Sequence, residues 1–289
     1  MDVRLPVLDS WLHYSEHGAG PPVLFLHGNP TSSYLWRDVI GPVADAGYRC
    51  LALDLIGMGQ SGKPDLGYRL VDHLRYVNAF LDALDLDDVT LVGHDWGAVI
   101  ALDLLRTRPD QIVAVAFCEG HLHPIERWAD LDAGGRELFG RLRTPGVGEQ
   151  LVLEENFFVE TVLPSGVLRR LTDDELDAYR APYPDAASRR PLLQWPREIP
   201  IEGEPADVTA VVRTNQRTIA ESSAPKLLLH GEPGAVVGAA EVAWCRAHGQ
   251  NLDVVNVGRG SHFLPEDLPG PIAEALCGWL NRQFGHRGT

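Results

Sequence analysis

Short apolar runs alternate with longer amphipathic stretches along most of this chain. Runs of Val, Leu, Ile and Phe without polar alternation predict strands buried on both faces of a parallel sheet. The predicted strands are residues 23–26, 49–53, 89–92, 113–117, 226–230 and 253–257, with a weaker edge strand at 11–14. Helical spacing of apolar residues is clearest in residues 70–84, 98–106 and 272–284. This order of elements predicts an α/β fold with a mostly parallel sheet flanked by helices.

The alternation stops after Gly120 and resumes near Thr214. Residues 155–163 and 171–180, which lie between these points, have the mixed apolar and acidic character of short helices, whereas three prolines are expected to break residues 189–200. We therefore predict a helical cap inserted into one core. The predicted parts are residues 1–120 (core, first part), 121–213 (cap) and 214–289 (core, second part).

Composition and charge narrow the class of protein. The chain has 289 residues, of which 45% are hydrophobic and 22% charged, as in soluble globular proteins. Its net charge of −15 disfavours binding to nucleic acid or to an anionic membrane surface. We find no signal-peptide pattern and no uninterrupted apolar run of about 18 residues. We expect a cytoplasmic protein, as a monomer or small homo-oligomer.

The four cysteines are far apart and follow no metal-ligand or redox spacing. They are Cys50, Cys118, Cys245 and Cys277. Their apolar surroundings predict buried thiols rather than a metal site.

The strongest chemical signal is the segment LVGHDWGAVIAL, in which a predicted strand meets a predicted helix. Gly93 and Gly97 flank Asp95 in the pattern of a nucleophile elbow, a tight turn that presents its central side chain. A carboxylate in this place forms an ester by attacking an sp³ carbon that carries a leaving group, which favours an alkyl halide or an epoxide as substrate. The alternative is that Asp95 only caps the following helix.

A second signal is FLHGNPTSSYLW, which follows an early predicted strand. In this architecture an HG-x-P segment supplies an oxyanion-hole amide, so the backbone N–H groups of Asn29 and Trp96 are the predicted donors. Their side chains, an amide and an indole N–H, are suited to stabilising a departing halide. The alternatives are a loop-stabilising amide for Asn29 and a core aromatic for Trp96.

A third signal is GRGSHFLPED, which follows the last predicted strand. His262 is the candidate general base that would activate water against the ester. It needs a carboxylate partner to fix its tautomer. Glu119 and Glu232 each follow a predicted strand, and the residues alone leave the choice between them open.

The sequence resembles the haloalkane dehalogenases over nearly the whole chain. The resemblance is carried by HGNPTSSYLWR, DLIGMGQSGKP, GHDWGA and SHFLPED. It implies an α/β-hydrolase fold with an eight-stranded sheet, with Asp95 as nucleophile, His262 as base, and Asn29 with Trp96 as the halide-stabilising pair. The cap segments resemble the subfamily whose catalytic acid follows the sixth strand, which implies Glu119. The resemblance also implies a haloalkane and water as reactants, halide as a product, and no metal or cofactor.

Three cap residues align with the family's substrate pocket, namely Phe139, Phe158 and Pro196. The alternative for these residues is simple packing within the cap. His121 and His123 follow the presumed acid and are not a feature of the family; they are expected either near the cavity or on the surface.

Three other functions share this scaffold. Epoxide hydrolases activate the ring oxygen with cap tyrosines, and this cap contains Tyr179 and Tyr183, but they usually lack an asparagine at the position of Asn29. Coelenterazine-using luciferases resemble the same subfamily, although the proline of HGNP favours the dehalogenase. A binding protein with slow turnover is the third alternative, and repeated turnover would exclude it.

Overall fold

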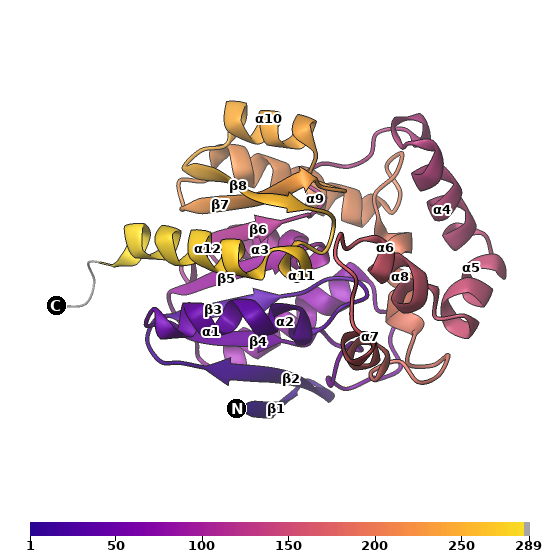
Figure 1. Cartoon of the computed structure of the whole chain (residues 1–289), viewed down its shortest axis with the longest axis horizontal. Helices are drawn as coiled ribbons and strands as arrows, with labels where there is room; N and C mark the ends of the chain where they lie inside the picture. Colours follow the sequence, from indigo (N-terminus) through magenta and orange to yellow (C-terminus); the bar gives the residue numbers. More distant parts are fainter. Residues whose placement is uncertain (286–289) are drawn as a thin grey trace.

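The computed structural model describes residues 1–285, and within them the strands form one eight-stranded sheet (Figure 1). The strands are β1 (Asp2–Val7), β2 (Ser10–His17), β3 (Pro22–Leu26), β4 (Arg49–Leu53), β5 (Val89–His94), β6 (Ile112–Cys118), β7 (Lys226–Pro233) and β8 (Leu252–Gly260). Their order is β1-β2-β4-β3-β5-β6-β7-β8. β1 and β2 pair antiparallel with their neighbours, and every other pair is parallel. The end of the predicted second core part, residues 286–289, lies outside the described residues.

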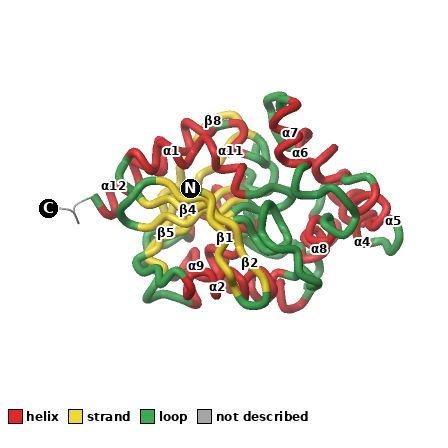
Figure 2. Tube along the Cα trace, turned by 90° about the horizontal axis from the view of Figure 1, so that it is seen from below, coloured by secondary structure: helices red, strands yellow, loops and turns green. Residues whose placement is uncertain are grey.

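Helices cover both faces of this sheet, and others lie together at one end of it. They are η1 (Ser33–Trp36), α1 (Arg37–Asp45), α2 (Leu70–Ala83), α3 (Trp96–Thr107), η2 (Trp128–Asp130), α4 (Ala133–Arg143), α5 (Val147–Glu149), η3 (Gln150–Glu154), η4 (Phe158–Val162), α6 (Leu163–Ser165), α7 (Asp173–Arg180), α8 (Arg190–Glu198), α9 (Ala206–Glu221), α10 (Ala239–His248), α11 (Leu264–Asp267) and α12 (Pro269–Phe284). Figure 2 shows α1, α11 and α12 on one side of the strands and α2 and α9 on the other. Double coverage explains why all six residues of β5 are buried.

The six predicted parallel strands are confirmed, most with one to three further residues at their ends. Residues 11–14 do form part of a strand, β2, but the prediction that it lies at the edge of the sheet is wrong, because β2 lies between β1 and β4. The strand at that edge is β1, which the sequence analysis missed. Its residues alternate between exposed and partly buried, and the edge of a sheet tolerates its Pro6 because a proline there removes no needed ladder donor.

The segment between β6 and β7 contains η2 through α9, and Figure 1 shows α4 to α8 together at one end of the sheet. Helical structure is confirmed in residues 155–163 and 171–180. The expectation that prolines break residues 189–200 is wrong, because α8 runs without interruption from Arg190 to Glu198. Pro191 lies in its first turn, where a backbone N–H has no helical partner to lose, and Pro196 lies inside it. The boundaries of the cap stay a prediction.

A buried ionic cluster attaches the α7 region to the core. Its members, here called the Glu266 cluster, are Arg37, Arg169, Glu175, Tyr179 and Glu266. The Glu266 carboxylate is fully buried, accepts two hydrogen bonds from Arg37 at 2.6 and 2.8 Å, and also contacts Arg169 and the Tyr179 hydroxyl. Charge-assisted hydrogen bonds on every side compensate the cost of burying this carboxylate.

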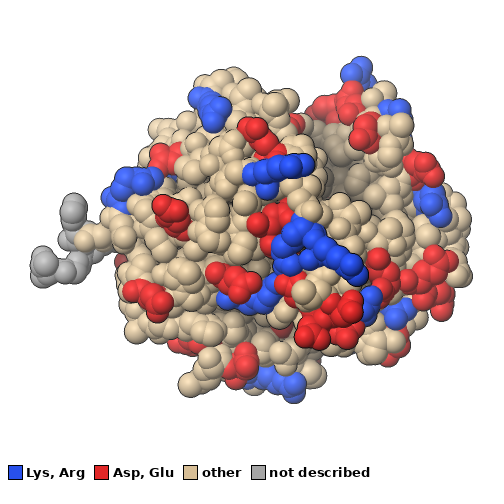
Figure 3. All heavy atoms as spheres, in the orientation of Figure 1, with Lys and Arg blue, Asp and Glu red and all other residues tan. Residues whose placement is uncertain are grey.

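Acidic and basic side chains are interspersed on the face shown in Figure 3. Many of them form surface ion pairs, such as Arg180 with Glu160 at 2.7 Å. A nucleic-acid-binding face would instead gather basic side chains along a continuous stripe.

Candidate active site

Asp95 is the single residue between β5 and α3 and forms a sharp turn. Its backbone has φ +55°, a conformation that non-glycine residues rarely adopt, as expected for a nucleophile elbow. Gly97 makes the turn possible, because a Cβ atom there would lie 2.2 Å from the carbonyl oxygen of Leu26 on β3. The turn holds the Asp95 side chain at the carboxyl end of the central strands, with 6% of the residue exposed.

Asn29 lies in the loop after β3 and contacts Asp95 through its backbone. Its N–H donates to Asp95 Oδ1 at 2.9 Å. Its side-chain Nδ2 donates to the carbonyl oxygen of Leu192 in α8 at 3.4 Å. The backbone and the side chain of Asn29 therefore have different partners.

Trp96 is the first residue of α3, and its ring is held in place by stacking. The Trp195 ring of α8 stacks on it with centroids 4.6 Å apart and an interplanar angle of 22°. Among the described residues, no acceptor bonds the Trp96 indole N–H, and Trp96 lines a cavity together with Asn29 and Asp95. The sequence analysis missed Trp195, and only its position in the LLQWP segment of the cap could have pointed to it.

His262 lies between two carboxylates. Its Nε2 is 3.5 Å from Asp95 Oδ2, and its Nδ1 is 3.3 Å from Glu119 Oε2. Glu119 is completely buried and accepts backbone N–H bonds from the loop after β7, at residues 235–237, over 2.8 to 3.4 Å. Glu232 is exposed and accepts from Asn256 instead. The structure brings Glu119 to the histidine and does not bring Glu232.

The paired charges govern the protonation of this site. Burial alone would lower the pKa of His262, but hydrogen bonds and charge from Asp95 and Glu119 raise it to about 9. Burial would likewise raise the pKa of Asp95, and His262 lowers it below its ordinary value. The free site therefore holds an imidazolium beside an ionised Asp95.

His94, the residue before Asp95, is hydrogen-bonded to the backbone of His262. Burial lowers the pKa of His94 to about 3, so its imidazole is neutral. Its Nε2 lies 2.8 Å from the carbonyl oxygen of His262, to which it must donate as an N–H because a carbonyl only accepts. The sequence analysis assigned no role to His94 and did not predict this link to His262.

Above these groups is a mostly apolar cavity of about 290 Å³. The predicted pocket residues Phe139, Phe158 and Pro196 all line it, and so does His121. The apolar lining residues that sequence reasoning missed are Leu138, Val162, Ile199, Ala235, Val236 and Phe263. Burial lowers the pKa of His121 to about 4, so it is a neutral polar group in this wall. His123 instead lies 3.3 Å from Glu241, partly exposed.

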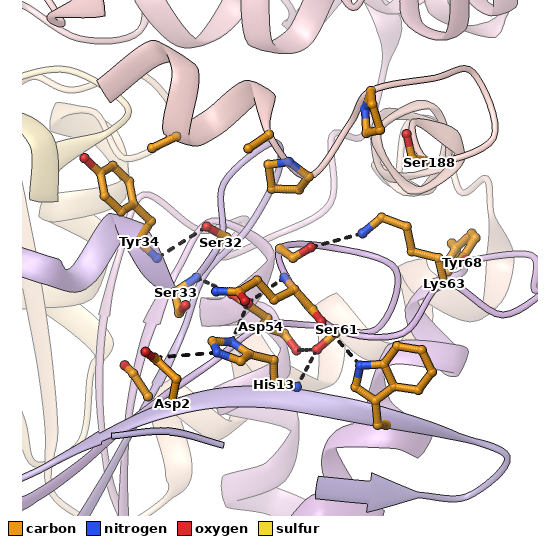
Figure 4. A pocket seen from close by; sticks show the side chains of 18 of the residues that line it. Asp2, His13, Ser32, Ser33, Tyr34, Asp54, Ser61, Lys63, Tyr68 and Ser188 are labelled. Atoms are coloured by element: carbon orange, nitrogen blue, oxygen red, sulfur yellow. Dashed lines mark hydrogen bonds and ion pairs between the residues drawn. The ribbon is translucent and has the colours of Figure 1, made fainter. Parts of the chain in front are cut away.

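A larger groove of about 1190 Å³ lies between β2 and the loop joining α7 to α8 (Figure 4). Its central carboxylate, Asp54, is occupied by His13 Nδ1 at 2.8 Å and by the backbone N–H groups of Ser33 and Gln60. None of the predicted triad lines this groove. Asp54 is committed to holding loops together, so the chemistry belongs to the smaller cavity.

Within residues 1–285, no group of three or more His, Cys, Asp or Glu side chains is arranged to hold a metal ion. In the same residues no helix has the length and apolar character needed to cross a bilayer. Of the cysteines, all free, Cys50, Cys118 and Cys245 are buried as predicted, whereas Cys277 is only partly buried.

Known proteins similar to this chain share its whole architecture. Residues 21–264 match the family model of the alpha/beta hydrolase fold. A haloalkane dehalogenase of Mesorhizobium japonicum is 52% identical over 280 residues, which are 96% of this chain and 90% of that protein. The solved structure of a haloalkane dehalogenase from Bradyrhizobium elkani is 44% identical, with a TM-score of 0.94 over 98% of each chain. That of another from Agrobacterium tumefaciens C58 is 41% identical, with a TM-score of 0.92 over 98% of this chain and 96% of that one.

Proposed function

Since the chain belongs to the haloalkane dehalogenases of the α/β-hydrolase fold, we propose that it cleaves carbon–halogen bonds through an ester formed on Asp95. It is a hydrolase whose substrates are a haloalkane and water and whose products are an alcohol and a halide ion. The observation that carries the proposed mechanism is the placement of the Asp95 carboxylate, with an amide donor on one oxygen and His262 beside the other.

The two carboxylate oxygens have different surroundings, which suggests different roles. Oδ1 accepts the backbone N–H of Asn29, whereas Oδ2 has no such donor and lies on the histidine side. Oδ2 attacks the halogen-bearing carbon, the C–O bond forms as the carbon–halogen bond breaks, and the electron pair leaves with the halide. Oδ1 becomes the ester carbonyl, already placed where an amide can stabilise an oxyanion.

The departing halide needs donors in a dry cavity. The indole N–H of Trp96 and the side-chain amide of Asn29 supply them, since both line the cavity and neither can be deprotonated near neutral pH. A donor already aimed at the leaving ion stabilises the developing charge without reorganisation.

Hydrolysis of the ester returns the enzyme to its starting state. Loss of the Asp95 charge on ester formation lets the His262 imidazolium release its proton to solvent. The neutral His262 then takes a proton from water, the hydroxide oxygen attacks the ester carbonyl carbon, and the proton passes to the alcohol oxygen as it leaves. Glu119 orients the imidazole through Nδ1. Asp95 is freed as the acid and passes its proton to His262, which restores the starting state. The proton that His262 released earlier balances the halide, so one haloalkane and one water give one alcohol, one halide ion and one proton.

Our proposal also includes the extent of the cap, the cellular compartment and the oligomeric state. Residues 121–213 act as the cap that closes the cavity over Asp95. The enzyme works in the cytoplasm, as a monomer or small homo-oligomer.

The test is bromide release from 1-bromobutane beside hydrolysis of 1,2-epoxybutane. We expect many bromide ions per chain and no diol. In support, neither Tyr179 nor Tyr183, the cap tyrosines that an epoxide hydrolase would need, lines the cavity. Diol formation without bromide would replace this proposal with epoxide hydrolysis, and a single equivalent of bound ligand without turnover would indicate a binding protein.

A further inference from the structure

The two prolines of α8 have different consequences for its hydrogen bonds. Pro191 lies in the first turn, whereas Pro196 lies inside the helix. Proline has no backbone N–H, so the carbonyl of the residue four positions earlier loses its helical donor. For Pro196 that carbonyl belongs to Leu192, and for a buried carbonyl an unmade hydrogen bond is costly.

The donor that replaces the missing N–H comes from the core. Asn29 Nδ2 donates to the Leu192 oxygen at 3.4 Å, and both residues are buried. A carbonyl oxygen can only accept, so it selects the NH₂ end of the Asn29 amide and rejects the oxygen end. One N–H of Asn29 is thereby used on α8, and the other is left for the cavity that Asn29 lines.

The same turn of α8 also contacts the second proposed halide donor. Trp195, next to Pro196, stacks on Trp96, and its own indole N–H points to the sulfur of Met58 at 3.2 Å. The other face of Trp195 stacks on His73 at 4.1 Å. This turn of the cap helix therefore touches both side chains to which halide stabilisation is assigned.

We propose that Pro196 is a positioning residue for halide stabilisation: by leaving the Leu192 carbonyl free, it orients the Asn29 amide toward the leaving halide. The inference rests on the proposed role of Asn29. It extends the role of Pro196 from a wall of the pocket to a residue that acts through another.

The variant Pro196→Ala tests this by restoring the N–H that competes for the Leu192 carbonyl. Pro191→Ala is the matched control, because it makes the same chemical change in the same helix at a position that releases no interior carbonyl. The measurements are the bromide inhibition constant, the rate of the first bromide burst from 1-bromobutane, and the rate of ester hydrolysis. For Pro196→Ala we expect about 3- to 10-fold weaker bromide binding and a burst slowed by a similar factor, with ester hydrolysis unchanged. Pro191→Ala should match the wild type in all three.

A double-mutant cycle with Asn29→Ala separates positioning from direct contact of the proline ring with halide. If Pro196 acts through Asn29, the change to alanine has no further effect once Asn29 is removed. An undiminished effect in the Asn29→Ala background would overturn the inference, as would bromide binding equal to the wild type in Pro196→Ala. Failure of the wild type itself to release bromide would instead overturn the proposed function.

A second variant weakens the same carbonyl without touching Pro196. Replacing the amide nitrogen of Leu193 by an ester oxygen makes the Leu192 carbonyl a poorer acceptor. We expect weaker bromide binding here too, and unchanged binding would contradict the inference even if Pro196→Ala did not fold.

Discussion

Asp95→Asn should show that the charge on the nucleophile controls the proton on the base. In the free enzyme the pKa of His262 is raised to about 9, so at neutral pH its imidazole is protonated and cannot accept a proton from water. Formation of the ester removes the negative charge of Asp95. The asparagine variant imitates that neutral state in the same shape.

The size of the effect follows from the distance between the two groups. Nε2 of His262 lies 3.5 Å from Asp95 Oδ2, and at an effective dielectric constant near 20 such a pair is worth about 5 kcal/mol. One pKa unit corresponds to about 1.4 kcal/mol, so loss of the charge should lower the pKa of His262 by about 3. Glu119, which remains, offsets part of the lowering that burial causes.

The measurement is an NMR titration of enzyme labelled at histidine, with the His262 signal identified by its loss in His262→Phe. Glu232→Gln is the control, because it removes an exposed carboxylate that does not contact His262. The wild type and the control should titrate near pH 9, and Asp95→Asn near pH 6 or below. A His262 signal that still titrates above pH 8 in Asp95→Asn would refute the reasoning, because ester formation then could not release the base.

Four further outcomes follow from the same site. His262→Phe should release about one equivalent of bromide from 1-bromobutane and keep the alkyl group, seen as added mass on the intact protein; continued turnover would remove the histidine from its role. Glu119→Gln should slow ester hydrolysis at least about 100-fold, and Glu232→Gln should not, which single-turnover kinetics would decide. Trp96→Phe keeps a ring to stack on its neighbour but loses the indole N–H, so bromide release should slow by about 10- to 100-fold, and an unaltered rate would count against that donor. Finally, because the folded pKa of His262 is raised, its protonation contributes stability that is complete below about pH 6.5 and lost as the pH rises toward 9; the melting temperature of the wild type should fall over this window, and that of His262→Phe should fall less.

The motif residues could be predicted because their chemistry is local. Asp95 and Trp96 lie on one turn, and the strands that end near Asn29 and His262 could be predicted from their Val, Leu and Phe residues. The structure brings these four residues together, although their roles stay predictions. The choice between Glu119 and Glu232 could not be made in this way. Both lie near the carboxyl ends of neighbouring parallel strands, β6 and β7, and the choice depends on how the loop after β7 folds its backbone around one of them.

The cap was harder to predict for a related reason. Rules for proline treat a helix as isolated, and in α8 the carbonyl that Pro196 leaves open is bonded by an amide from a distant part of the chain. The missed strand β1 gave a weak signal because only its final residue, Val7, is fully buried. For α8, the deciding partner, Asn29, is remote in sequence.

The Glu266 cluster also limits how far the α7 region can move away from the core. Moving the α7 region away from the core would break a buried ion pair, at a cost of about 3–5 kcal/mol. Because Glu266 lies four residues after His262, the same movement would also displace the proposed base. The α7 region is therefore expected to stay attached to the core. Passage of haloalkane inward and alcohol outward is expected past the opposite flank, where Leu138 and Phe139 of α4 border the cavity and only Leu142 of that helix is fully buried. Changes that loosen α4 should then alter how fast products escape while leaving the bond-making steps intact.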